Sequence, residues 1–266
     1  MPDYYQYLSW IKSGQLGHLF LDSRYTSSAQ PAALVHPLFA ITGMITGLFH
    51  ISTPVSYLLL RILATLVFLF ALNRFIRSIF PSRHHRIIAL LLFLFGAGFE
   101  TVSWSEHFGI ISKYSLPPHH LLALAAWMGL ILSFVRPALA KLIVLGWILA
   151  LLNPSIFLFA LVFLAFSNIR NSKFWILTLG VSPILFYNAM ILRTTPPWSI
   201  MYARMLAFNP PTAFTDYLLS LFPLLPLSLL GAWKLRSCML IAWAYLPIVL
   251  FPFVGMLPIN YSRLFQ

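Results

Sequence analysis

The chain has 266 residues, of which 60% are hydrophobic and only 8% are charged. Because soluble domains carry about 25% charged residues, this composition excludes an ordinary soluble domain and indicates a membrane protein. A net charge of +12 would favour nucleic-acid binding in a soluble protein. Here the basic residues stand at the ends of apolar segments, as in membrane proteins, so we expect no nucleic-acid partner.

The first segment, MPDYYQYLSWIKSGQLG, predicts an amphipathic helix that begins after Asp3. Gln6 follows Asp3 in the spacing of a capping box, so Asp3 is a candidate N-cap. The same carboxylate could instead deprotonate a hydroxyl or amine, or bind a metal ion. One helical face carries the apolar side chains Tyr4, Tyr7, Leu8 and Ile11.

The next apolar segment, Ala33 to Phe49, is flanked by Pro31, Pro37 and Pro54. If it crossed the membrane, the arginines that follow the next apolar segment would lie on the outer side. We therefore expect it to lie in the outer interface or to dip in from that side. Residues 1–54 then form one external loop.

Eight further apolar segments predict an all-α, polytopic transmembrane helical bundle over residues 55–266. Several are shorter than the roughly 20 residues that cross a bilayer untilted, so we expect polar ends to extend them or the bundle to enclose them. The segments are Val55–Phe75, Ile87–Trp104, Leu121–Val135, Ala138–Leu152, Ser155–Phe166, Phe174–Leu192, Phe214–Trp233 and Cys238–Met256.

The distribution of charge predicts the orientation of this bundle. Ten of the seventeen basic residues fall at every second turn, which the positive-inside rule assigns to the cytoplasm. These are Arg74, Arg77, Arg83, Arg86, Arg136, Lys141, Arg170, Lys173, Lys234 and Arg236. All five acidic residues, Asp3, Asp22, Glu100, Glu106 and Asp216, fall on the external side.

An external loop at the start of the chain needs a preceding span or a signal sequence, and neither is present in the sequence. We therefore expect the chain to be a fragment that lacks a first transmembrane helix. The single cysteine, Cys238, excludes an intrachain disulfide and offers no Cys/His zinc pattern.

The sequence contains several short motifs: PDYYQYLSWIKSGQLGHL at the start, Tyr25-Thr26, HPLF at His36–Phe39, Arg61 early in the next span, PPHH before Leu121 and LLNPSI at Leu151–Ile156. Together they resemble the motifs of GT-C integral membrane glycosyltransferases of the Pmt/ArnT type. Relatives would carry a histidine before the proline of LLNPSI, where this chain has Asn153. No second acid stands beside Asp3.

The resemblance implies transfer of a sugar from a polyprenyl-phosphate donor to an acceptor, at the outer face of a bacterial inner membrane. Asp3 is then the expected base, and Glu106 is the second catalytic candidate. A divalent metal ion would have Glu106 and His107 as candidate ligands. Candidate substrate-binding residues are His36, Arg61, Lys113, His119, Arg193, Arg204 and Arg263.

Other interpretations stay open. Arg61 could pair with Glu100 as a structural ion pair instead of facing a donor phosphate. Glu106 could anchor the interface beside Trp104 without touching a substrate. His119 and His120 are adjacent, so we expect their side chains to point in different directions. The whole chain could also be a lipid or solute transporter, a flippase, or a non-catalytic assembly subunit.

Overall fold

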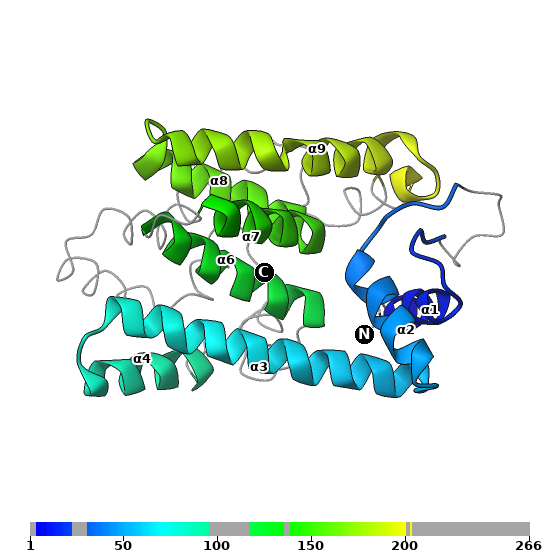
Figure 1. The fold of residues 1–266 in the computed structure, drawn as a ribbon, viewed down its shortest axis with the longest axis horizontal. Helices are drawn as coiled ribbons and strands as arrows, with labels where there is room; N and C mark the ends of the chain where they lie inside the picture. Colours follow the sequence, from blue (N-terminus) through cyan, green and yellow to red (C-terminus); the bar gives the residue numbers. More distant parts are fainter. Residues whose placement is uncertain (1–3, 23–30, 96–116, 136–138, 201–202, 204–266) are drawn as a thin grey trace. The chain divides into compact units, whose positions relative to one another are not determined.

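The computed structural model describes residues 4–22, 31–95, 117–135, 139–200 and 203. Over these residues the fold is all-helical, without a β-strand, which confirms the all-α part of the expected fold class (Figure 1). One isolated antiparallel bridge in this part of the chain pairs Leu21 with Ala33. The helices are α1 (Tyr4–Gln15), α2 (Pro37–Leu48), α3 (Thr53–Ile79), α4 (Arg83–Phe95), α6 (Pro118–Val135), α7 (Leu139–Leu152), α8 (Pro154–Asn168) and α9 (Ser172–Thr194).

Two helices in the described part, α3 and α9, are long and apolar enough to cross a membrane. Their 27 and 23 residues correspond to about 40 and 35 Å of helix, against a hydrocarbon thickness of about 30 Å. Helices α2, α6 and α7 are also apolar but shorter. The predicted spans Phe214–Trp233 and Cys238–Met256, and part of Ile87–Trp104, lie outside the described residues.

The chain divides into two compact units. Unit 1 contains residues 1–72, 117–157 and 177–204, which include α1, α2, most of α3, α6, α7 and most of α9. Unit 2 contains residues 73–116, 158–176 and 205–266, which include the end of α3, α4, most of α8 and the start of α9.

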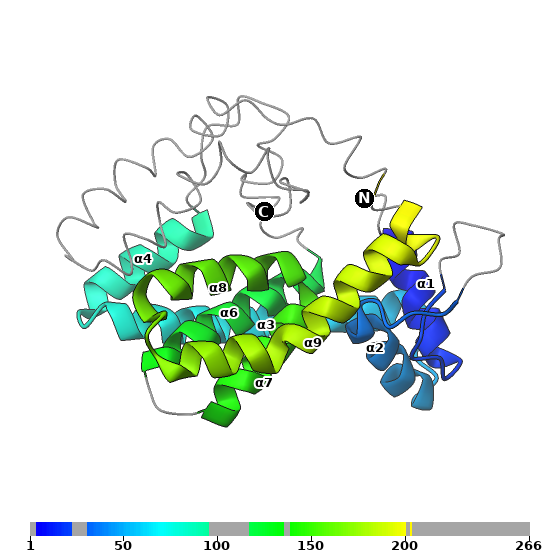
Figure 2. The ribbon, with the colours of Figure 1, turned by 90° about the horizontal axis from the view of Figure 1, so that it is seen from above.

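In unit 1, α1 and α2 pack side by side at very close range (Figure 2). Small residues permit this approach: a Cβ at Gly14 would collide with the carbonyl of Ala40, and one at Gly43 would collide with the carbonyl of Ile11. The end of α1 is also tied to the following segment by Gln15. Its Nε2 donates to the carbonyl of Ile51 at 2.8 Å, and its Oε1 accepts from the Thr53 hydroxyl at 3.0 Å.

Elsewhere in unit 1, α7 packs against α6. It also packs against the parts of α8 and α9 that belong to this unit. The backbone of α7 comes close to its neighbours at Gly146, where an added Cβ would meet Leu177 at 2.5 Å and Val181 at 2.9 Å. One residue further along, the Trp147 indole donates to the carbonyl of Gly180 in α9 at 2.8 Å.

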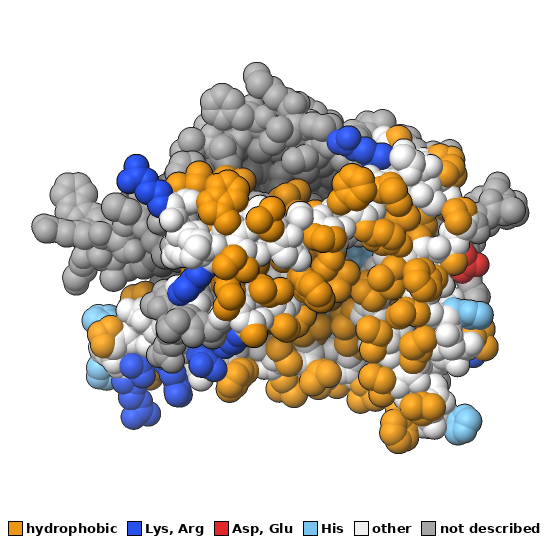
Figure 3. All heavy atoms as spheres, turned by 45° about the horizontal axis from the view of Figure 1, so that its top comes forward, with side chains coloured by type: hydrophobic (Ala, Val, Ile, Leu, Met, Phe, Trp, Pro, Cys, Tyr) orange, Lys and Arg blue, Asp and Glu red, His pale blue; other side chains and the backbone are white. Residues whose placement is uncertain are grey.

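Large apolar side chains cover much of the surface of the long helices (Figure 3). Phe70 of α3 is 69% exposed and Phe186 of α9 is 74% exposed. On α3 alone the exposed set also includes Val55, Leu58, Leu59, Ile62, Leu63, Leu66 and Val67. Contiguous apolar surface of this kind is unfavourable in water and matches a lipid surrounding.

Candidate functional site

A cluster of aromatic rings and imidazoles lies in unit 1, built from segments that are far apart in the sequence. We call it the histidine–aromatic cluster. Its members are Tyr7 and Trp10 of α1, His36 and Phe39 at the start of α2, Tyr57 of α3, His119 of α6 and Trp198 after α9.

Helix α1 contributes its buried face to this cluster. The helical spacing of Tyr7, Trp10 and Ile11 places the three side chains on one side, where all are buried. The Tyr7 ring stacks on Phe39 with centroids 4.7 Å apart and on Tyr57 with centroids 6.2 Å apart. Aromatic pairs of this kind contribute about 0.5–1.5 kcal/mol each beyond the burial of their area.

His36 stands at the N-cap of α2 in a left-handed backbone conformation, with φ 49° and ψ 60°. Pro37 follows at the first helical position, which suits proline because that backbone N–H would have no partner within the helix. The left-handed conformation is unfavourable for a residue with a Cβ, so its surroundings must hold it. The imidazole stacks on Trp10 at 5.1 Å and meets the ring of His119 edge-on at 5.1 Å.

His119 and His120 begin α6 and lead to different neighbours. His119 is 4% exposed and contacts Tyr7 and Phe39 as well as His36. The Nδ1 of His120 lies 3.3 Å from the Nδ2 of Asn153, which donates to it when Nδ1 carries no proton. The two imidazoles nevertheless touch, with centroids 4.2 Å apart. We expected the two side chains to point in different directions. They do have different neighbours, but their rings lie against each other.

Asn153 caps α8 and also links it to α6. Its Oδ1 accepts the backbone N–H of Ile156 at 3.1 Å, and Pro154 occupies the first helical position. The side chain is 8% exposed, and its amide Nδ2 faces His120. Asn153 of the segment LLNPSI thus belongs to the surroundings of the cluster.

The far side of the cluster is formed by α9 and the segment after it. The Tyr187 hydroxyl accepts the backbone N–H of Leu34 at 2.9 Å, which ties the segment before α2 to α9. Trp198 is 4% exposed and its ring lies 6.3 Å from that of Trp10. Its indole Nε1 is buried and has no hydrogen-bond partner among the described residues. A bound molecule with an acceptor oxygen could satisfy this donor.

Arg61 lies on α3 one turn beyond Tyr57 and is half-buried. Tyr57 contacts Tyr4, the first described residue of α1, with ring centroids 5.1 Å apart. The guanidinium therefore belongs to the same end of unit 1 as the cluster. Its alternative partner, Glu100, lies outside the described residues.

Of the remaining predicted site residues, the structure describes only Arg193, which is not a member of the cluster. Arg193 is exposed near the end of α9. The residues Asp3, Glu106, His107, Lys113, Arg204 and Arg263 lie outside the described residues. Within the described ranges, no three His, Cys, Asp or Glu side chains are grouped so that they could hold a metal ion.

The cluster thus brings together aromatic rings that pack against one another, two imidazoles in contact and a nearby guanidinium. Imidazole and guanidinium groups can donate hydrogen bonds to oxygens. Comparison of the chain with protein-family models, curated proteins and solved structures gives no match.

Proposed function

We propose that the chain is a membrane glycosyltransferase of the GT-C type, which transfers a sugar from a polyprenyl-phosphate donor to an acceptor at the outer face of a bacterial inner membrane. In this proposal the chain forms a polytopic bundle of about eight spans. The observation that carries it is the contact between His36 and His119, which joins two of the motifs on which the resemblance rests.

The charge pattern supports placing this cluster on the outer side. The positive-inside rule assigns the start of α3, the start of α6, the α7–α8 turn and the end of α9 to one side of the membrane. Tyr57, His119, Asn153 and Tyr187 come from these four places, and all belong to the cluster or its immediate surroundings. Segments assigned to one side by charge alone are thus joined by contacts in unit 1.

The chemistry of sugar transfer assigns a role to each group. A base removes the proton from the acceptor hydroxyl, the acceptor oxygen forms a bond to the anomeric carbon of the sugar, and the bond from that carbon to the phosphate oxygen breaks. The polyprenyl phosphate leaves with the bonding electrons. Arg61 and the two imidazoles would stabilise its developing charge, and the aromatic rings would hold the sugar.

Asp3 is the proposed base because it directly precedes α1, whose first residue packs on Tyr57, one turn from Arg61. The matched control is Asp22, the other acid of residues 1–54, which is exposed. Both acids can be changed to the isosteric amide, so that charge is lost at little change in shape.

The test uses the full chain in liposomes of native lipid extract, with an undecaprenyl-phosphate-linked hexose as the probe and release of undecaprenyl phosphate as the measurement. Asp3→Asn should lower the rate at least about 100-fold, the typical contribution of general base catalysis, while Asp22→Asn leaves it unchanged. If Asp3→Asn retained the full rate, the assignment of the base would be wrong. If wild-type protein released no undecaprenyl phosphate but moved the probe across the bilayer, a flippase would replace the transferase.

A further inference from the structure

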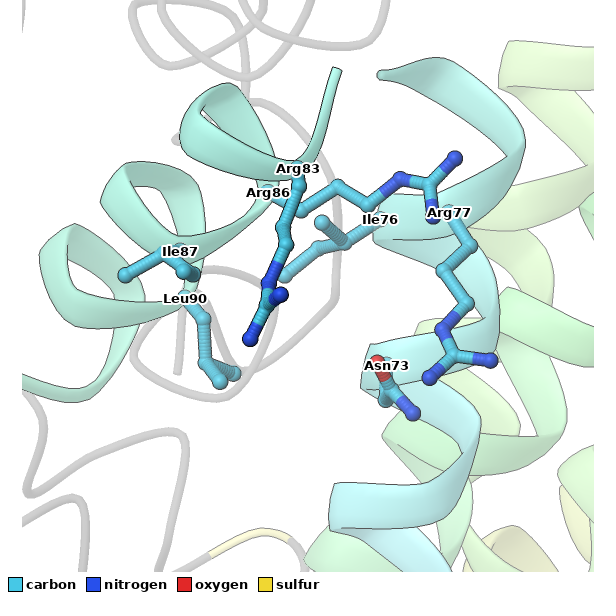
Figure 4. Close-up of a pocket in the computed structure, with 7 residues that line it drawn as sticks. All are labelled: Asn73, Ile76, Arg77, Arg83, Arg86, Ile87 and Leu90. Atoms are coloured by element: carbon cyan, nitrogen blue, oxygen red, sulfur yellow. The ribbon is translucent and has the colours of Figure 1, made fainter. Parts of the chain in front are cut away.

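A pocket of about 450 Å³ lies in unit 2 between the end of α3 and α4 (Figure 4). Asn73, Ile76 and Arg77 line it from α3, and Arg83, Arg86, Ile87 and Leu90 line it from α4. The lining is amphiphilic, because three guanidinium groups stand beside three branched aliphatic side chains.

The three arginines have different environments. Arg86 is half-buried, and its guanidinium donates to the carbonyls of Phe80 and Pro81 at 2.6 and 2.8 Å, so it closes the turn between the two helices. Arg77 and Arg83 are exposed and make no ion pair or hydrogen bond through their side chains with the described residues. In Figure 4, Arg83 extends from α4 into the space that faces Asn73 of α3.

Among the residues of unit 2 that the structure describes, no acidic side chain balances the positive charge of this pocket. The described part of unit 2, residues 73–95 and 158–176, contains no acidic residue, while it contains Arg74, Arg77, Arg83, Arg86, Arg170 and Lys173. The N-terminus of α4 at Arg83 adds backbone N–H groups and the positive end of the helix dipole. Both contributions favour an anion.

We propose that this pocket binds the phosphate headgroup of an anionic phospholipid. Guanidinium groups pair with phosphate oxygens in a bidentate geometry, which suits Arg77 and Arg83. The aliphatic side chains of Ile76, Ile87 and Leu90 would contact the glycerol and the first carbons of the acyl chains. A basic pocket at the cytoplasmic end of membrane helices is the typical place for such a headgroup. This site does not depend on sugar transfer.

The test uses the purified full chain in a mild detergent with an equimolar mixture of phosphatidylglycerol and phosphatidylcholine, and measures retained lipid by native mass spectrometry. Wild-type protein should retain phosphatidylglycerol preferentially. The double variant Arg77→Gln/Arg83→Gln should reduce this preference roughly 25-fold, because each basic residue at an anionic surface contributes a factor of about five. Arg74→Gln is the matched control, since Arg74 is exposed on the same helix but does not line the pocket.

An unchanged preference in the folded double variant would overturn the proposal. If the double variant did not fold, the single variant Arg83→Gln should still show a roughly fivefold reduction, and no reduction there would equally count against the site. A third experiment adds inorganic phosphate to the wild-type protein with bound phosphatidylglycerol. Displacement of phosphatidylglycerol by an equal concentration of inorganic phosphate would show a site for free phosphate and contradict the lipid assignment.

Discussion

Single residues connect the parts of the candidate site, and Asn153 does so most clearly. It caps α8 through its Oδ1 and faces His120 of α6 through its Nδ2. Two members of the cluster, His36 and His119, were predicted from the sequence as substrate-binding residues. Both stand beside prolines in segments with a recognisable motif. Trp10, Phe39, Tyr57 and Trp198 were not predicted as site residues, since aromatic residues in an apolar sequence give no signal that separates a site from a core.

We predict that Asn153→Ala lowers the free energy of unfolding by about 2 kcal/mol, the sum of a lost cap and a lost hydrogen bond. Asn171 is the matched control, because its Oδ1 accepts the backbone N–H of Lys173 at 3.0 Å and its side chain has no second partner among the described residues. Asn171→Ala should cost only about 1 kcal/mol. Unfolding in mixed detergent micelles measures both, and equal losses would show that the contact with His120 adds no stability.

The sequence predicted which segments form long helices more accurately than it predicted the residues at which those helices begin and end. The apolar segment Val55–Phe75 became α3 from Thr53 to Ile79, and Phe174–Leu192 became α9 from Ser172 to Thr194. Each helix continues into polar residues, as expected, because backbone hydrogen bonding does not stop where apolar side chains end. The segment Ala33–Phe49 contains the shorter helix α2, of 12 residues. That corresponds to about 18 Å, less than a bilayer thickness.

The close packing of α1 on α2 could not be predicted, because glycine spacing alone does not identify a partner helix. We expect Gly43→Ala to destabilise the protein by about 1–3 kcal/mol, the usual cost of overpacking, since the new Cβ meets the backbone of Ile11. The control is Gly180→Ala in α9, where the nearest atoms are Ile143 side-chain carbons at 3.9 Å. There the substitution should be neutral or stabilising. A thermal melt that shows equal effects would contradict the close approach.

Two features concern the chain as a whole. Apolar side chains cover much of the surface of α3 and α9, and the sequence predicts that basic residues stand at every second turn between spans. Helix α3 carries Tyr57 near its start and Arg74 and Arg77 near its end. Aromatic residues near one end and arginines near the other are the usual arrangement of a membrane helix, which favours the proposed orientation. The central claim is therefore an orientation, with the histidine–aromatic cluster outside and the arginine pocket inside.

The measurement that tests this claim most directly is the labelling of single cysteines by a membrane-impermeant maleimide in intact cells. Cys238→Ser removes the native thiol, and His18→Cys and His84→Cys each place one thiol at an exposed position. We predict that His18→Cys is labelled from outside and that His84→Cys is labelled only after the membrane is permeabilised. Labelling of His84→Cys but not His18→Cys in intact cells, or equal labelling of both, would contradict the proposed orientation and the external site that depends on it.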